Sequence, residues 1–139
     1  MGAEVKPTGK TERGQGLIEF ALLIPIMLVL AIGIAEFGRA WMMRNILTGA
    51  AREAVRAAAV DWKANACVNA QTIADPILAS AGIPPLVCGD VTISPIGAPV
   101  PIVSVTTRYT FLPILTGFIP GLSGPINLTG TATMRRERD

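Results

Sequence analysis

An apolar stretch near the N-terminus constrains this chain more than any other feature of its sequence. From Leu17 to Phe37 the residues are apolar apart from two carboxylates, Glu19 and Glu36. As an α-helix this stretch would be about 31 Å long, which is enough to cross the hydrocarbon core of a bilayer. A carboxylate in such a segment is costly and is retained mainly where it acts. The sequence therefore predicts a transmembrane helix over 17–37 and marks Glu19 as a candidate functional residue.

The composition agrees with a membrane segment and argues against several functions. Half of the 139 residues are hydrophobic and 16% are charged, whereas about a quarter of the residues in a soluble domain are charged. The net charge of +2 is small, and no basic stripe interleaved with aromatic residues indicates nucleic acid binding. The chain has no histidine, the commonest general base and metal ligand. We find no catalytic, cofactor-binding or metal-binding constellation, and we expect a protein that is not an enzyme.

The helix is expected to continue beyond the membrane segment. No helix breaker follows Phe37, and apolar residues recur at alternating steps of three and four, which is typical of an amphipathic helix. These apolar positions are Ala40, Met43, Leu47, Ala50, Ala54 and Ala57. Most of them are small, so another helix or a sheet can approach closely. We predict one long helix over 15–66.

The remainder of the chain, 67–139, has the residue pattern of a small β-rich domain. A short amphipathic stretch comes first, and we expect Pro76 to break it. Alternation over 102–111 predicts a strand whose inner face carries Val103, Val105, Thr107, Tyr109 and Phe111. A shorter strand is expected near Val91, and 112–125 is expected to form an apolar loop.

Residues 126–134 predict a further strand, but its alternation is out of phase in the middle. Ile126, Leu128, Thr131 and Thr133 share one face only if a β-bulge forms at Gly130. The predicted fold class is α+β, with a long N-terminal transmembrane helix that continues into an amphipathic helix and packs on a small antiparallel β-rich head.

Two cysteines bear on the compartment of the head. Cys67 and Cys88 are the only cysteines, and neither belongs to a metal-binding pattern. They form either one disulfide in an oxidising compartment or two reduced thiols buried in a cytosolic protein. The membrane segment favours the disulfide, which would connect the end of the long helix to the first strand. Basic residues flank both ends of the segment, so charge alone leaves its orientation open.

The N-terminal half resembles a known family. The residues that carry the resemblance are Gly14, Gln15, Glu19, Phe20 and Pro25, then Glu36 to Arg39, and later Ala50 to Glu53 and Arg56. In these positions the chain resembles TadE-like proteins, which are minor pilin-like subunits of the Tad/Flp tight-adherence pilus machinery. Tyr109 to Phe111 and Thr131 to Arg136 are similar to the C-terminal strands of the family, although more weakly.

The resemblance implies proteolytic processing at the cytoplasmic face of the membrane. A prepilin peptidase would cut between Gly14 and Gln15, and residues 1–14 would be a cytoplasmic leader. Gly16 is a rival position, but a cut there would leave Glu19 as the third residue of the mature chain. Glycine suits such a position because it has no side chain to obstruct the protease. The glycine motif and the disulfide both place the N-terminus inside.

The resemblance also implies a role for Glu19. After cleavage, the α-amino group of Gln15 is a cation at the head of a membrane helix, and Glu19 of a neighbouring subunit could neutralise it. The alternative is that Glu19 reaches the cytoplasmic headgroups and has no partner. At the other end of the span, Glu36 and Arg39 are expected to form an ion pair in the outer headgroup layer.

We therefore expect a structural minor pilin or pseudopilin in the bacterial cytoplasmic membrane, with a periplasmic or extracellular head. Its partners would be the prepilin peptidase, other Tad pilus subunits, the inner-membrane assembly platform and membrane lipid. One alternative is a membrane-anchored accessory protein of the same machinery that does not enter the filament. Another is a secreted protein whose signal peptide ends near Ala40, although its apolar core would be unusually long and Glu19 would be unexplained.

Overall fold

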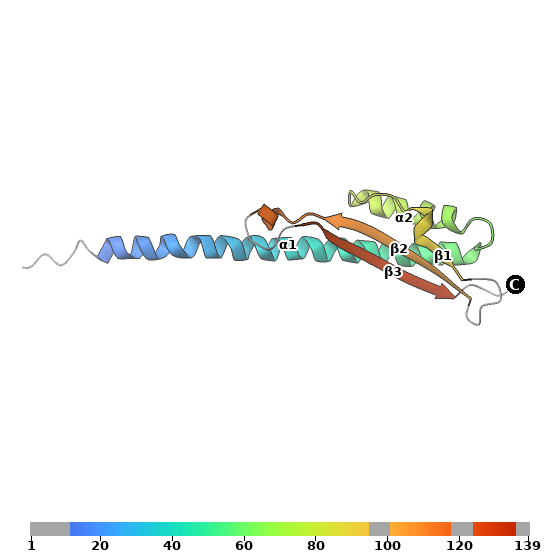
Figure 1. The fold of residues 1–139 in the computed structure, drawn as a ribbon, viewed down its shortest axis with the longest axis horizontal. Coiled ribbons are helices and arrows are strands. Elements are labelled where there is room, and N and C mark those ends of the chain that lie inside the picture. Colours follow the sequence, from blue (N-terminus) through green and yellow to red (C-terminus); the bar gives the residue numbers. More distant parts are fainter. Residues whose placement is uncertain (1–11, 95–100, 118–123, 136–139) are drawn as a thin grey trace, which may run out of the picture. The chain divides into compact units, whose positions relative to one another are not determined.

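The computed structural model describes residues 12–94, 101–117 and 124–135. Its elements are helices α1 (Glu12–Val60) and α2 (Ala66–Ser80), strands β1 (Val91–Ile93), β2 (Ile102–Phe111) and β3 (Ile126–Arg135), and two short 3-10 helices, η1 (Cys88–Asp90) and η2 (Ile114–Gly117) (Figure 1). The predicted fold class, α+β with a long N-terminal apolar helix, is confirmed. The predicted leader and the C-terminal tail lie largely outside the described residues.

The chain divides into two compact units, 1–36 and 37–139. In the first unit, every large apolar side chain of α1 from Leu17 to Ile34 is exposed. An 18-residue window in this helix has a mean hydropathy of 2.7, and none of that window is buried. By length and composition, α1 is thus able to cross a membrane. An exposed apolar surface of this extent needs lipid or another protein to cover it.

The second unit has a core in which the C-terminal half of α1 meets α2 and the sheet (Figure 1). The predicted apolar stripe is confirmed at Leu47, Ala50 and Ala54, which are fully buried. The buried face is wider than this stripe and also includes Ala51, Val55, Ala58 and Ala59. The width follows from the packing, because residues of both α2 and β2 join the same core cluster.

The boundary between the two helices differs from the prediction. α1 ends at Val60 rather than at Ala66, and a turn leads into α2. α2 then continues through Pro76, so the predicted break at this proline is wrong. Proline inside a helix removes a hydrogen bond and costs about 3 kcal/mol. Burial of the α2 face formed by Ala66, Ala70, Ala74 and Leu78 offsets that cost.

The sheet is antiparallel, with the strand order β1-β2-β3. β2 and β3 pair without interruption from Ile102 opposite Arg135 to Phe111 opposite Ile126. The predicted bulge at Gly130 is therefore wrong. Gly130 pairs with Thr107 and lies on the inner face, whereas Thr131 and Thr133 lie on the outer face.

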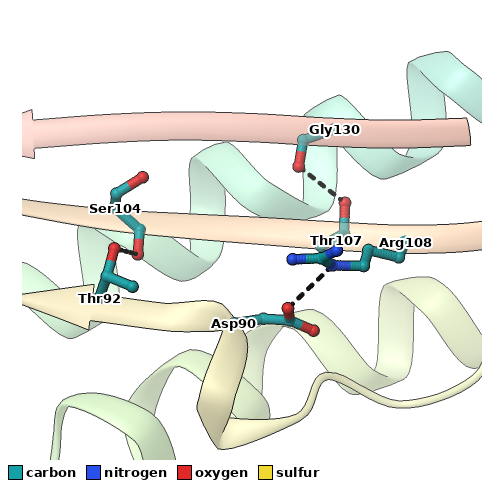
Figure 2. A network of polar contacts seen from close by, with 6 residues as sticks. All are labelled: Asp90, Thr92, Ser104, Thr107, Arg108 and Gly130. Atoms are coloured by element: carbon teal, nitrogen blue, oxygen red, sulfur yellow. Dashed lines mark hydrogen bonds and ion pairs between the residues drawn. The ribbon is translucent and has the colours of Figure 1, made fainter.

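The inner face of the sheet lies very close to the α1 backbone at Gly130. A Cβ atom built on this glycine would lie 2.5 Å from the Leu47 carbonyl carbon, a distance that side chains essentially never reach. Thr107, which is 1% exposed, lies beside it. The Thr107 Oγ1 atom is 2.9 Å from the Leu47 carbonyl oxygen. It is also 3.2 Å from the carbonyl oxygen of Gly130 (Figure 2). The hydroxyl thus connects strand and helix where glycine brings their backbones together.

Two further connections hold α2 to the segment that follows it. A disulfide joins Cys67 to Cys88, with the Cα atoms 5.4 Å apart. Because Cys67 belongs to α2, the disulfide connects α2 to η1 rather than the end of α1 to a strand. Leu86 is held by its backbone, since its N–H donates to Asp75 Oδ1 at 2.9 Å and its carbonyl accepts from Gln71 Nε2 at 2.8 Å.

Candidate processing and assembly site

The predicted processing position lies in the first turn of α1. Gly14 and Gln15 are exposed, and Gly14 comes two residues after the helix begins at Glu12. A Cβ atom added at Gly14 or at Gly16 would meet nothing within 4 Å. Packing within the chain therefore gives no reason for glycine at either position. Each glycine weakens the helix by about 1 kcal/mol relative to alanine, so the peptide bond after Gly14 lies in a turn that unwinds easily.

Glu19 lies one helical turn after Gln15, on the same side of α1, since residues four apart are neighbours on a helix surface. Its side chain is exposed among exposed apolar residues. Within the described ranges, no hydrogen bond or ion pair involves Glu19. The arrangement leaves this carboxylate accessible to a cation supplied by its own N-terminus, by a second chain or by a headgroup.

Glu36 differs from Glu19. It is 8% exposed, whereas the Glu19 side chain is exposed. The Arg39 guanidinium lies 5.0 Å from the centroid of the Phe111 ring, a cation–π distance. The predicted pairing of Glu36 with Arg39 remains a prediction.

Several polar contacts of the head are not evident from the sequence. The sequence does place Thr107 on the inner face, and a threonine there is itself a signal, because buried hydroxyls require a hydrogen-bond partner. Asp75 is isolated in the sequence, yet it binds the Leu86 backbone. Its partner is a backbone group, which no residue pattern reveals. The ion pair of Arg108 with Asp90 likewise depends on the register of β2 against β1.

Among the described residues, no group of three or more His, Cys, Asp or Glu side chains is placed to hold a metal ion. The candidate site is the N-terminal part of α1, which combines exposed glycines, an exposed carboxylate and an exposed apolar surface. A comparison with protein families addresses this segment directly. The family described as TadE-like protein matches residues 14–56.

This segment is TadE-like. The match contains Gly14, Gln15 and Glu19, as well as most of the buried stripe of α1, and it indicates a protein related to the Tad pilus. No curated protein and no solved structure matches the chain. The TadE-like segment ends at Arg56, so it does not extend to α2 or the sheet.

Proposed function

We propose that this chain is a structural minor pilin or pseudopilin of a Tad-type pilus or secretion system. The observation that carries the proposal is the TadE-like segment of α1, whose apolar side chains from Leu17 to Ile34 are all exposed. Such a surface suits a helix that is embedded in the membrane before assembly and packs against the helices of other subunits afterwards. Lipid and neighbouring helices both cover apolar side chains.

The proposal includes cleavage between Gly14 and Gln15 by a prepilin peptidase at the cytoplasmic membrane face. The weak first turn of α1 supports it, since a protease needs an accessible and locally unwound peptide bond. The rival cut after Gly16 lies in the same turn. It would place Glu19 two residues closer to the new N-terminus, with less than a helical turn between amine and carboxylate.

Cleavage creates a cation where the helix already concentrates positive partial charge. The α-amino group of Gln15 and the N-terminal end of the helix dipole are both positive, and both favour a nearby carboxylate. Glu19 of the same chain is one turn away, and Glu19 of a neighbouring subunit can approach from the side. We propose that the neighbour provides the pairing in the assembled state, because helix packing removes both charges from water and makes an unpaired charge costly.

The proposed orientation places the N-terminus in the cytoplasm and the head in the periplasm or outside the cell. The disulfide between Cys67 and Cys88 supports it, because disulfides persist in oxidising compartments. In this orientation the peptidase, other Tad subunits and the inner-membrane assembly platform are the expected partners. The role is structural rather than catalytic.

Mass spectrometry of the membrane-associated chain tests the proposal. The full chain with a C-terminal tag is produced with and without a prepilin peptidase, and its intact mass is measured. We expect loss of residues 1–14 only when the peptidase is present, which leaves Gln15 as the first residue. Gly14→Leu should block the cut, whereas Gly16→Ala should leave it in place.

Any outcome of the mass spectrometry other than these expected results contradicts part of the proposal. An intact N-terminus in the presence of an active peptidase excludes processing. A cut that Gly16→Ala shifts or abolishes assigns the site to Gly16. A soluble product that begins at Trp41 identifies residues 1–40 as a signal peptide and removes the anchor on which the proposal depends.

A further inference from the structure

The head has a cavity that the proposed assembly function does not use. It has a volume of about 380 Å³ and is lined by Pro84, Arg108, Tyr109, Thr110, Asn127 and Thr129. Small-molecule sites measure about 300–1,000 Å³, so this cavity is at the small end of that range. Most of its lining residues are exposed, so the cavity is open to solvent, and its volume has room for a ligand of a few rings at most.

The strand register explains why polar groups gather at this cavity. Arg108 is paired with Thr129, and Thr110 is paired with Asn127, so these four side chains share the outer face of the sheet. The Thr110 hydroxyl donates to Asn127 Oδ1 at 3.3 Å. This contact orients the Asn127 amide and occupies its oxygen. The Nδ2 group of Asn127 and the Thr129 hydroxyl then offer hydrogen bonds to a ligand.

Arg108 is oriented by an ion pair with Asp90, whose Oδ1 atom is 3.0 Å from Arg108 Nε (Figure 2). The bond uses the inner edge of the guanidinium, and the two terminal amino groups retain their donors. The Arg108 side chain is 68% exposed, so these donors face solvent. Asp90 also compensates the charge of Arg108, which lowers the attraction for a free anion and favours a ligand without net charge.

Pro84 and Tyr109 also line the cavity, and both residues carry apolar atoms. A ligand that fits must therefore combine an apolar face with several hydroxyl groups on its edges. Pyranose rings have this pattern, with C–H groups on one face and hydroxyls around the rim. We propose that the cavity between Pro84 and the β2–β3 face is a binding site for a neutral saccharide.

The inference goes beyond the proposed pilin function and requires only the geometry of the head. If the head lies outside the cytoplasmic membrane, as proposed above, the saccharides within reach are glycans of a cell envelope or of a surface. The binding itself does not depend on processing at Gly14, so a chain that is not cleaved should still bind.

The test uses the full chain, purified in lauryldimethylamine oxide because glucoside and maltoside detergents carry sugar headgroups. Chitotriose and maltotriose are the neutral probes, and 3′-sialyllactose and inorganic phosphate are the charged ones. Binding is followed by backbone amide shifts in two-dimensional NMR. We expect saturable binding of a neutral probe with a Kd near about 1 mM, with the largest shifts at Thr110, Asn127 and Thr129.

Two substitutions locate the site. Asn127→Ala removes the amide donor, and we expect it to weaken binding about tenfold, which corresponds to about 1.4 kcal/mol. Thr129→Val removes a hydroxyl at nearly constant shape and should weaken binding in the same direction. Thr133→Ala, on the same outer face but outside the cavity lining, is the matched control and should bind as the unmodified chain does.

The proposal is overturned if neither neutral saccharide produces saturable shifts. It is also overturned if only sialyllactose or phosphate binds, since the site would then be an anion site of Arg108. Equal binding by the Asn127→Ala, Thr129→Val and unmodified chains would place the saccharide elsewhere. A dispersed amide spectrum of each variant establishes that the head is folded, so a loss of binding is not a loss of structure.

Discussion

Gly130 of β3 lies against the backbone of Leu47 in α1 so closely that a Cβ atom at this position would overlap the peptide group, 2.5 Å from its carbonyl carbon. Thr107 is the partner of Gly130 in the neighbouring strand. Its hydroxyl donates a hydrogen bond to the Leu47 carbonyl oxygen, with 2.9 Å between the two oxygen atoms. The contact fixes the sheet to the TadE-like helix. Three residues from three elements therefore meet at this point of the interface between the sheet and α1.

The first prediction concerns this close approach. Gly130→Ala should destabilise the head by about 1–3 kcal/mol, because overpacking forces the backbone to shift. Urea unfolding of the full chain in micelles, followed by the fluorescence of its tryptophans, measures the change. Gly49→Ala is the matched control. Gly49 is an exposed helical glycine, and a Cβ atom added to it would meet nothing within 4 Å, so alanine there should stabilise α1 by up to about 1 kcal/mol. Equal stability of the two variants would contradict the contact.

The second prediction isolates the hydrogen bond. Thr107→Val keeps the shape of the side chain and removes the hydroxyl, so stability should fall by about 0.5–1.5 kcal/mol. The same unfolding experiment serves as the measurement. Thr131→Val, an exposed threonine on the outer face of β3, is the control and should change stability little. If valine at position 107 were neutral, the buried hydroxyl would have no net stabilising role.

The third prediction concerns the disulfide. It closes a loop with a sequence separation of 21 residues, and the chain-entropy estimate for such a loop is about 3 kcal/mol. A double substitution, Cys67→Ser with Cys88→Ser, should lower the unfolding free energy by roughly that amount, and reductant should lower that of the unmodified chain similarly. Thiol labelling under denaturing conditions gives the redox state directly. Two reactive thiols in chain isolated from the membrane without reductant would place the head in a reducing compartment.

The sequence predicts most elements of this fold, and the reasons for the exceptions are physical. The apolar run of α1 and the alternation of Val103, Val105 and Thr107 are long, regular patterns, and the structure contains both elements. The predicted phase of β3 is wrong at Gly130 because a glycine on the inner face has no apolar side chain to continue the pattern. Its role depends on α1, which is distant in the sequence.

Pro76 gives a second example. Local propensity predicts a break there, whereas the buried alanines and Leu78 of α2 keep the helix intact on both sides of the proline. Tertiary packing thus outweighs a local cost of about 3 kcal/mol.

The candidate site could be predicted from the sequence only in part. Gly14 and Glu19 can be selected from the sequence because their residue types are unusual in their setting, but the cation proposed to pair with Glu19 would belong to a processed N-terminus or to a neighbouring chain, which the sequence of one chain does not reveal.

The final prediction tests that cation. Glu19→Gln preserves the size of the side chain and its hydrogen-bonding oxygen but removes its charge. We expect cleavage between Gly14 and Gln15 to continue, and we expect the amount of mature chain in sheared fibres relative to membranes to fall about tenfold, which corresponds to about 1.4 kcal/mol of lost pairing. Glu53→Gln removes an exposed carboxylate later in α1 and should leave this ratio unchanged.

If the Glu19→Gln chain enters fibres as well as the unmodified chain does, the Glu19 carboxylate has no role in assembly, and its contact with headgroups is favoured. If the unmodified chain is itself absent from fibres, the chain acts as an accessory protein that remains in the membrane.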